Sequence, residues 1–177
     1  MPLLLEEFVL NRRGDDFPPQ LIGLAKKCLL DMIGNIIAGG RTEAGQAARS
    51  FAAQFSGVQE ATIIGSAGTA QPILAAFANA VAGSALDADD GHRGALGHPG
   101  AVVVPAALAA AEVTGASGGE LLEAIIVGYE VAIRAGLILN AAGEEVDYGS
   151  GAWGSFGAAA AGARLDRVSP QELLNAL

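Results

Sequence analysis

The chain has 177 residues, of which 51% are hydrophobic, and it carries a formal net charge of −9 at pH 7. A chain of this length forms one domain of ordinary size and can bury a substantial core. The acidic balance argues against nucleic-acid binding, because phosphate contacts need clustered Lys and Arg, and the ten basic residues here are scattered.

Cysteine content and hydrophobic patterning indicate a protein of a reducing compartment. The single cysteine, Cys28, lies in an apolar helical pattern and excludes an internal disulfide framework. No basic segment followed by an apolar core opens the chain, so no signal peptide is expected. The uncharged run 61–86 is long enough to span a bilayer, but its Gly, Ser, Pro and Asn residues favour a buried helix followed by a loop. We expect a cytoplasmic protein without membrane association.

The first half of the chain is predicted to contain two helices and one short strand. The first helix begins at Pro18 and Pro19 and ends at Gly39 and Gly40, with apolar residues at helical spacing between them. A second helix is expected over 42–55. The stretch 61–65, ATIIG, is strand-like and short.

Further helices are predicted over 69–86, 101–113, 118–140 and 152–165, each bounded by Gly, Ser or Pro. Capping boxes are expected where Ser117 precedes Glu120 and where Ser169 precedes Glu172. The predicted fold class is therefore all-α, a helical bundle of about six to eight helices.

Small residues are abundant in these helices and predict close helix packing. Glycine inside a helix costs up to about 1 kcal/mol relative to alanine. We therefore expect a neighbouring helix to lie against each of the interior glycines Gly128, Gly136, Gly154, Gly157 and Gly162. The last predicted helix has only two turns before Leu177, so we expect it to dock on a partner or, preferably, to continue into a longer protein.

The stretch 86–100, LDADDGHRGALGHPG, gathers three acids, an arginine and both histidines of the chain between two apolar helices. Loops held between rigid helices often carry catalytic groups, and a carboxylate with an imidazole suits acid–base chemistry. A metal site is less favoured, because the spacing matches no zinc signature. A solvated loop whose aspartates cap the next helix stays open as an alternative.

These residues resemble the MmgE/PrpD family, which includes 2-methylcitrate dehydratase, cis-aconitate decarboxylase and iminodisuccinate epimerase. The family pattern here is close to D-x-D-D-T-H followed by H-P-S and a Val/Pro/Ala helix, and this chain has DADDGH at 87–92, HPG at 98–100 and then AVVVPAALAAAE. Further matches are LLDMIGNIIAGG at 29–40, GYEVAIRAG at 128–136, WGSFGAAAAGARL at 153–165 and SPQELLNAL at 169–177. The resemblance covers essentially the whole chain.

The resemblance implies the first part of a large all-helical domain, so residues 1–177 would lack the α/β lid domain and the C-terminal helices of the family. Family members usually form homodimers without a metal or an organic cofactor. By position, Asp87 and His98 match residues that line the family's active site. Arg93 could pair with a substrate carboxylate, or form a salt bridge with Asp89 or Asp90 inside the loop.

Two positions depart from the family pattern. Gly91 stands where the family commonly has Thr, which removes a hydroxyl, and the family's H-x-T-G element reads Tyr148-Gly149-Ser150-Gly151, so its histidine is Tyr148. Tyrosine is a poor base at neutral pH because its reference pKa is about 10. Ser150 keeps a hydroxyl and opens a helix, which suits either carboxylate binding or a simple N-cap and turn.

We therefore expect Asp87, His98 and Tyr148 to be catalytic and Gly91, His92, Arg93 and Ser150 to contact substrate, with no metal. The implied function is a lyase or isomerase that removes a proton next to a carboxylate of a small di- or tricarboxylate, leading to dehydration, decarboxylation or epimerisation. The alternative is a non-catalytic or half-catalytic helical subunit that binds a second chain, which completes the fold.

Overall fold

The computed structural model describes residues 4–177 except 56, 59 and 142–148. Its fold is all-α, as predicted. The elements are α1 (Leu5–Asn11), a 3₁₀ turn η1 (Gly14–Asp16), α2 (Pro19–Gly39), α3 (Glu43–Ala52), β1 (Ala61–Thr62), β2 (Thr69–Ala70), α4 (Pro72–Ser84), α5 (Pro99–Thr114), α6 (Gly118–Ala141), α7 (Ser150–Asp166) and α8 (Pro170–Ala176).

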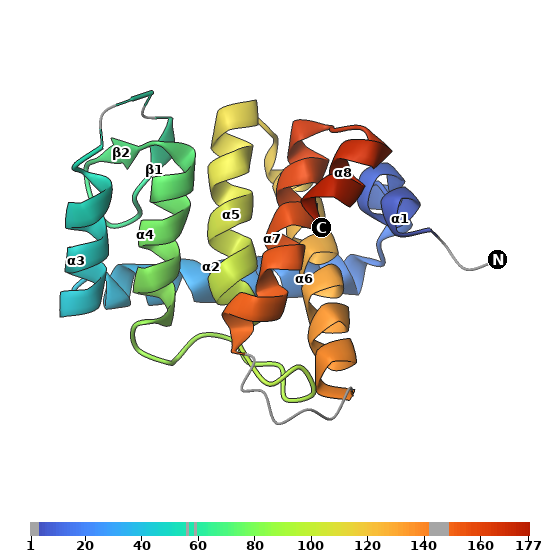
Figure 1. The fold of residues 1–177 in the computed structure, drawn as a ribbon, viewed down its shortest axis with the longest axis horizontal. Coiled ribbons are helices and arrows are strands. Elements are labelled where there is room, and N and C mark those ends of the chain that lie inside the picture. The colour runs from blue at the N-terminus through green and yellow to red at the C-terminus, as the bar shows by residue number, and fades with distance from the viewer. Residues whose placement is uncertain (1–3, 56, 59, 142–148) are drawn as a thin grey trace.

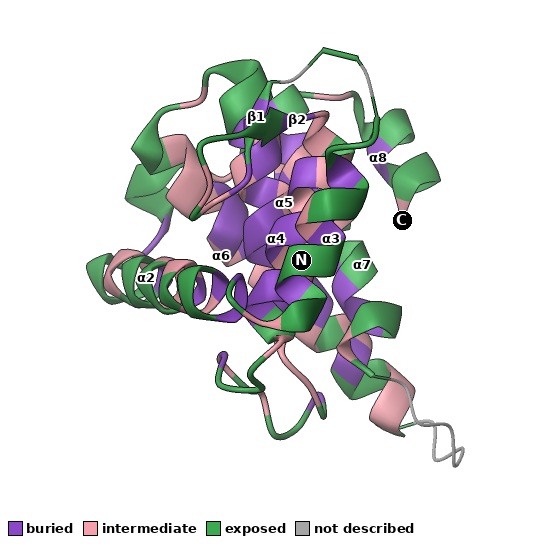
Figure 2. Ribbon diagram, turned by 90° about the vertical axis from the view of Figure 1, so that its left-hand side faces the viewer, coloured by how far each residue is buried: buried purple, intermediate pink, exposed green. Residues whose placement is uncertain are grey.

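Helices α3, α4, α5 and α7 stand in a row, and α2 crosses behind them against α4, α5 and α6 (Figure 1). The core lies where α5 meets α4, α6 and α7, and Figure 2 shows these inner faces as buried. Trp153 of α7, Val103 and Val104 of α5 and Ile125 of α6 are fully buried there. None of the helices in the described part of the chain is long and apolar enough to cross a membrane.

Several element boundaries differ from the sequence prediction. The strand is only Ala61–Thr62, and it pairs antiparallel with Thr69–Ala70, so α4 begins at Pro72 and not at residue 69. Helix α5 begins at Pro99, which makes His98 its N-cap residue. The N-terminal helix α1 was not predicted, because its single buried residue, Val9, gives no apolar periodicity.

Four of the five interior glycines lie at close contacts, as predicted. A Cβ on Gly128 of α6 would meet Val103 Cγ1 at 2.5 Å, and one on Gly157 of α7 would meet the carbonyl oxygen of Gly128. Gly136 faces Trp153 and Ala95, and Gly154 faces Val102. The prediction is wrong for Gly162, whose Cβ would meet no described atom within 4 Å. This glycine faces away from the α6–α7 contact.

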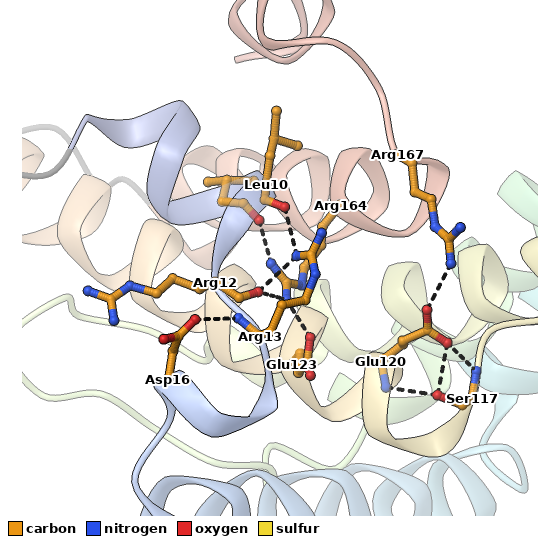
Figure 3. Close-up of polar contacts among 10 residues, drawn as sticks. Leu10, Arg12, Arg13, Asp16, Ser117, Glu120, Glu123, Arg164 and Arg167 are labelled. Atoms are coloured by element: carbon orange, nitrogen blue, oxygen red, sulfur yellow. Dashed lines mark hydrogen bonds and ion pairs between the residues drawn. The ribbon is translucent and has the colours of Figure 1, made fainter.

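The N-terminal segment is tied to the far end of the chain by Arg164 of α7 (Figure 3). The guanidinium donates to the carbonyl oxygen of Val9 at 2.7 Å and to that of Arg12, and it pairs with Glu123 of α6. An exposed pair, Arg167 with Glu120 at 3.0 Å, lies beside it. The capping boxes of Ser117 with Glu120 and of Ser169 with Glu172 are both confirmed.

Candidate functional site

The charged loop between α4 and α5 is folded back on itself. The backbone N–H of His92 donates to the carbonyl oxygen of Gly97 at 2.8 Å, and the Nδ1 atom of His92 accepts from the backbone N–H of Ala95 at 3.0 Å. The side chain of Asn140, near the end of α6, donates to the carbonyl oxygen of Gly94 at 3.0 Å. These hydrogen bonds hold the outer part of the loop in one conformation, and the His92 side chain is one of the groups that form them.

The three aspartates of the loop lie in three different environments. The side chain of Asp87 is 90% exposed, and that of Asp89 is 1% exposed. Asp90 Oδ1 accepts from the backbone N–H of Gly100 at 3.0 Å, in the first turn of α5. The expectation that aspartates cap the next helix therefore holds for Asp90.

His98 lies between the other two carboxylates. Its Nε2 atom is 3.5 Å from Asp87 Oδ1, and its Nδ1 atom is 3.4 Å from Asp89 Oδ1 and 3.2 Å from the carbonyl oxygen of Asp89. The backbone N–H of His98 donates to Ser150 Oγ at 2.7 Å. The start of α7 and the start of α5 are thereby joined beside the imidazole, which is 35% exposed.

A cavity of about 270 Å³ opens at this point between α4, α5 and α7. Its polar lining comes from Ser84, Asp87, Asp89, His98, Ser150 and Gly151, and its apolar lining from Ala80, Val81, Ala101 and Val102. Ser150 and Gly151 are the first residues of α7, where backbone N–H groups without helical partners favour an anion. The cavity therefore combines a titratable pair with a place suited to a carboxylate.

Burial alters the acid–base properties of two of the aspartates. Burial raises the pKa of Asp89 above its usual value, and its backbone hydrogen bond and His98 oppose this effect. Burial also raises the pKa of Asp90, against the hydroxyl of Tyr129 and the N–H of Gly100. The Tyr129 hydroxyl is close to Asp90 but makes no hydrogen bond of ordinary geometry.

Asp87, Asp89 and His98 are also the residues that could hold a metal ion. Each offers one ligand atom, and the three atoms lie within 4.8 Å of one another. In the structure the two carboxylates approach different nitrogens of the imidazole.

The structure brings together three of the predicted site residues, Asp87, His98 and Ser150. Of the described residues, those lining the cavity do not include Gly91, His92 or Arg93. Gly91 is exposed, with no described atom within 4 Å of an added Cβ, and Arg93 is exposed and makes no ion pair with Asp89 or Asp90. Tyr148 lies outside the described residues.

Sequence reasoning did not single out Asp89 as a site residue. Its signal is present in the D-x-D-D pattern, because the residue two positions after Asp87 is acidic and precedes a histidine. The pattern does not show which carboxylate is buried, and only the fold decides that.

Comparison with known proteins agrees with the resemblance seen in the sequence. The profile of the MmgE/PrpD N-terminal domain matches residues 4–177. The chain belongs to the MmgE/PrpD family. The cis-aconitate decarboxylase-like protein oryM of Aspergillus oryzae is 30% identical over 183 residues, which cover 96% of this chain and 37% of that relative. The chain thus spans well under half the length of this relative.

Proposed function

We propose that the protein is a lyase or isomerase that removes a proton next to a carboxylate of a small di- or tricarboxylate. The observation that carries this proposal is the position of His98, which lies between two carboxylates at a cavity that also contains the start of α7. Membership of the MmgE/PrpD family supports it.

The reaction needs a base and a site that stabilises negative charge, because a C–H bond next to a carboxylate is weakly acidic. The Nε2 atom of His98 or the carboxylate of Asp87 would take the proton. The hydroxyl of Ser150 and the first N–H groups of α7 would hold a substrate carboxylate. The carbanion-like intermediate would then expel a β-hydroxyl group, which takes up a proton and leaves as water, or be reprotonated. In a decarboxylation the carbanion would instead form by loss of CO₂, and the same groups would stabilise it and return a proton.

Other predicted contacts belong to the same proposal. Arg93 would reach a substrate carboxylate from the exposed side of the loop, since guanidinium groups bind carboxylates through two parallel hydrogen bonds. Gly91 and His92, which do not line the cavity, would shape the loop around it, and Tyr148 would complete the site. Because the chain spans 37% of the relative it matches, further basic groups and a lid would come from the rest of a longer protein. A homodimer without metal or organic cofactor and a cytoplasmic location are part of the same proposal.

A helical subunit that binds a second chain is the other candidate. Helix α2 exposes large apolar side chains, with Leu24 54% and Leu30 72% exposed, and such a surface suits a partner. The replacement of the family's threonine and histidine by Gly91 and Tyr148 also suits a loss of catalysis. Purification of the native protein separates the two candidates: a longer single chain that is active alone excludes a subunit role.

The enzymatic proposal is tested by solvent deuterium exchange. The native protein is incubated in D₂O with a panel of citrate-like and succinate-like acids, and incorporation, dehydration and decarboxylation are followed by NMR. We expect one acid to react and His98→Ala to lower kcat by about 100-fold or more, as loss of a general base does. Asp166→Asn, at the far end of α7, is the control and should retain the full rate. No reaction with any acid, or an unchanged rate in His98→Ala, contradicts the proposal.

A further inference from the structure

We infer that Asp89 is the positioning residue of His98: its buried carboxylate and its own carbonyl oxygen hold the Nδ1 atom of the imidazole, and the Nε2 atom is left toward Asp87 and the cavity. This inference rests on the proposed function, in which His98 handles the substrate proton. It gives a specific task to a residue that the resemblance alone did not single out.

The contacts of Nδ1 determine the tautomer of the neutral ring. The carbonyl oxygen of Asp89 lies 3.2 Å from Nδ1, and a carbonyl oxygen can only accept a hydrogen bond. Nδ1 must therefore carry the hydrogen. The carboxylate oxygen Oδ1 of the same residue, at 3.4 Å, faces the same N–H. The neutral imidazole consequently has its lone pair on Nε2, the nitrogen beside Asp87 Oδ1.

The difference in burial between the two aspartates separates their tasks. Asp89 is 1% exposed, and its Oδ2 atom is buried with no hydrogen-bond partner among the described residues. The side chain of Asp87 is 90% exposed, so solvent and substrate can reach it. Its backbone is left-handed, with φ 51°. A buried carboxylate can fix the ring and stabilise its protonated form, whereas an exposed one can exchange protons with substrate.

The surroundings of His98 leave the aspartates of the loop as its charged neighbours. Asp87, Asp89 and, at longer range, Asp90 act on it from the loop. Helix α7 presents the uncharged hydroxyl of Ser150. Of the described residues of α4 and α5 that line the cavity, none is titratable. Among the described residues that line the cavity, removing the charge of Asp89 therefore acts on His98 without a competing charge from α4, α5 or α7.

The tautomer is tested by NMR on the ¹⁵N-labelled protein. Long-range ¹H–¹⁵N spectra distinguish a protonated from an unprotonated ring nitrogen, and His92→Gln and His98→Gln variants assign the signals. We expect neutral His98 to carry its proton on Nδ1. Asp89→Asn keeps the size of the side chain and an acceptor oxygen but has no charge, so it should retain this tautomer.

Kinetics with the acid that reacts in the deuterium-exchange panel give the second measurement. Asp89→Asn should lower kcat about 10- to 100-fold with KM nearly unchanged. Circular dichroism and the thermal unfolding midpoint show whether the variant is folded. If Asp89→Asn does not fold, a proton on Nε2 of neutral wild-type His98 would still overturn the assignment.

Three results overturn the inference: a proton on Nε2 of neutral His98, an unchanged kcat in Asp89→Asn, or stoichiometric binding of Mg²⁺ or Zn²⁺ that Asp89→Asn abolishes. The last result makes Asp89 a metal ligand. Because the NMR measurement needs no substrate, an inactive protein with the expected tautomer contradicts the proposed function and leaves the positioning role standing.

Discussion

Three aspartates within four residues of chain differ in what their side chains contact, and so their substitutions should differ in effect. Asp87 is exposed beside Nε2 of His98, Asp89 is buried beside Nδ1, and Asp90 accepts a hydrogen bond from the start of α5. The first two act on the imidazole and should affect the rate. The third is bonded to the helix and should affect stability.

Asp90→Asn should change how stability depends on pH. Burial raises the pKa of Asp90 in the folded protein above 3.8, so the folded state holds this proton more tightly than the unfolded state. The wild type therefore loses stability from Asp90 as pH rises from about 3.8 through the folded-state pKa, and the loss is complete above it. The asparagine retains an acceptor for Gly100 N–H but cannot ionise. The free energy of unfolding of the variant minus that of the wild type should thus increase between about pH 4 and pH 7.

Urea unfolding at several pH values measures this difference, and effects of titratable groups remote from Asp90 cancel between the two proteins. A difference that is constant with pH, or that decreases as pH rises, would show that the Asp90 carboxylate is not penalised by burial. Asp166→Asn, on the exposed end of α7, is the control and should give a constant difference.

Part of this site could be predicted from the sequence. The resemblance identified Asp87 and His98, and the helix start at 150 brought Ser150 to them. The positions of His92 and Arg93 could not be predicted in the same way, because a loop has no periodicity that tells which side chain faces inward. The His92 ring stabilises the loop by accepting a hydrogen bond from the backbone N–H of Ala95. Burial of Asp89 likewise depends on α4, α5 and α7 meeting over it.

At the scale of helices, the contact between α6 and α7 depends on two glycines whose backbones touch. A Cβ on Gly157 would contact the carbonyl oxygen of Gly128 and lie 2.9 Å from Val103 Cγ2. Gly157→Ala should therefore destabilise the protein by about 1–3 kcal/mol, because the helices must separate. Gly162→Ala, five residues later on the same helix, meets open space and should stabilise it by about 0.5–1 kcal/mol. Urea unfolding of both variants measures the two changes, and equal changes would contradict the assigned contact.

The helices themselves were largely predictable, since apolar spacing and capping boxes lie within each segment. Their exact starts were less so. Residues 69 and 70 fit a helical pattern, but they pair with Ala61–Thr62, a partner that local spacing does not reveal. The environment of Gly162 could not be predicted for a related reason. Its neighbours in the sequence are nearly all small residues, so the sequence does not indicate which face of α7 packs against α6.

At the scale of the whole molecule, one arginine joins segments that are more than 150 residues apart in the sequence. Arg164 is 5% exposed and bonds two carbonyl oxygens of the N-terminal segment, those of Val9 and Arg12, as well as Glu123 of α6 (Figure 3). The last carbonyl groups of α1 have no backbone N–H of a following helical turn to accept from, and the guanidinium supplies the donor instead. Without it, the attachment of α1 to α7 would depend on apolar contacts alone.

Arg164→Ala should consequently lower the free energy of unfolding by about 3–5 kcal/mol, because it leaves the largely buried Glu123 without a counter-ion and the Val9 carbonyl oxygen without its donor. Arg167→Ala is the matched control on the same helix: its side chain is 81% exposed, and its pair with Glu120 should contribute no more than about 1 kcal/mol. In the combined variant Arg164→Met with Glu123→Gln neither partner of the pair is left charged, so part of the stability should return. The carbonyl oxygen of Val9 still lacks its donor, and that of Arg12 keeps only the donation from Arg13 Nη1. Full recovery in the combined variant would mean that the ion pair alone matters and that the N-terminal segment is held by its apolar contacts.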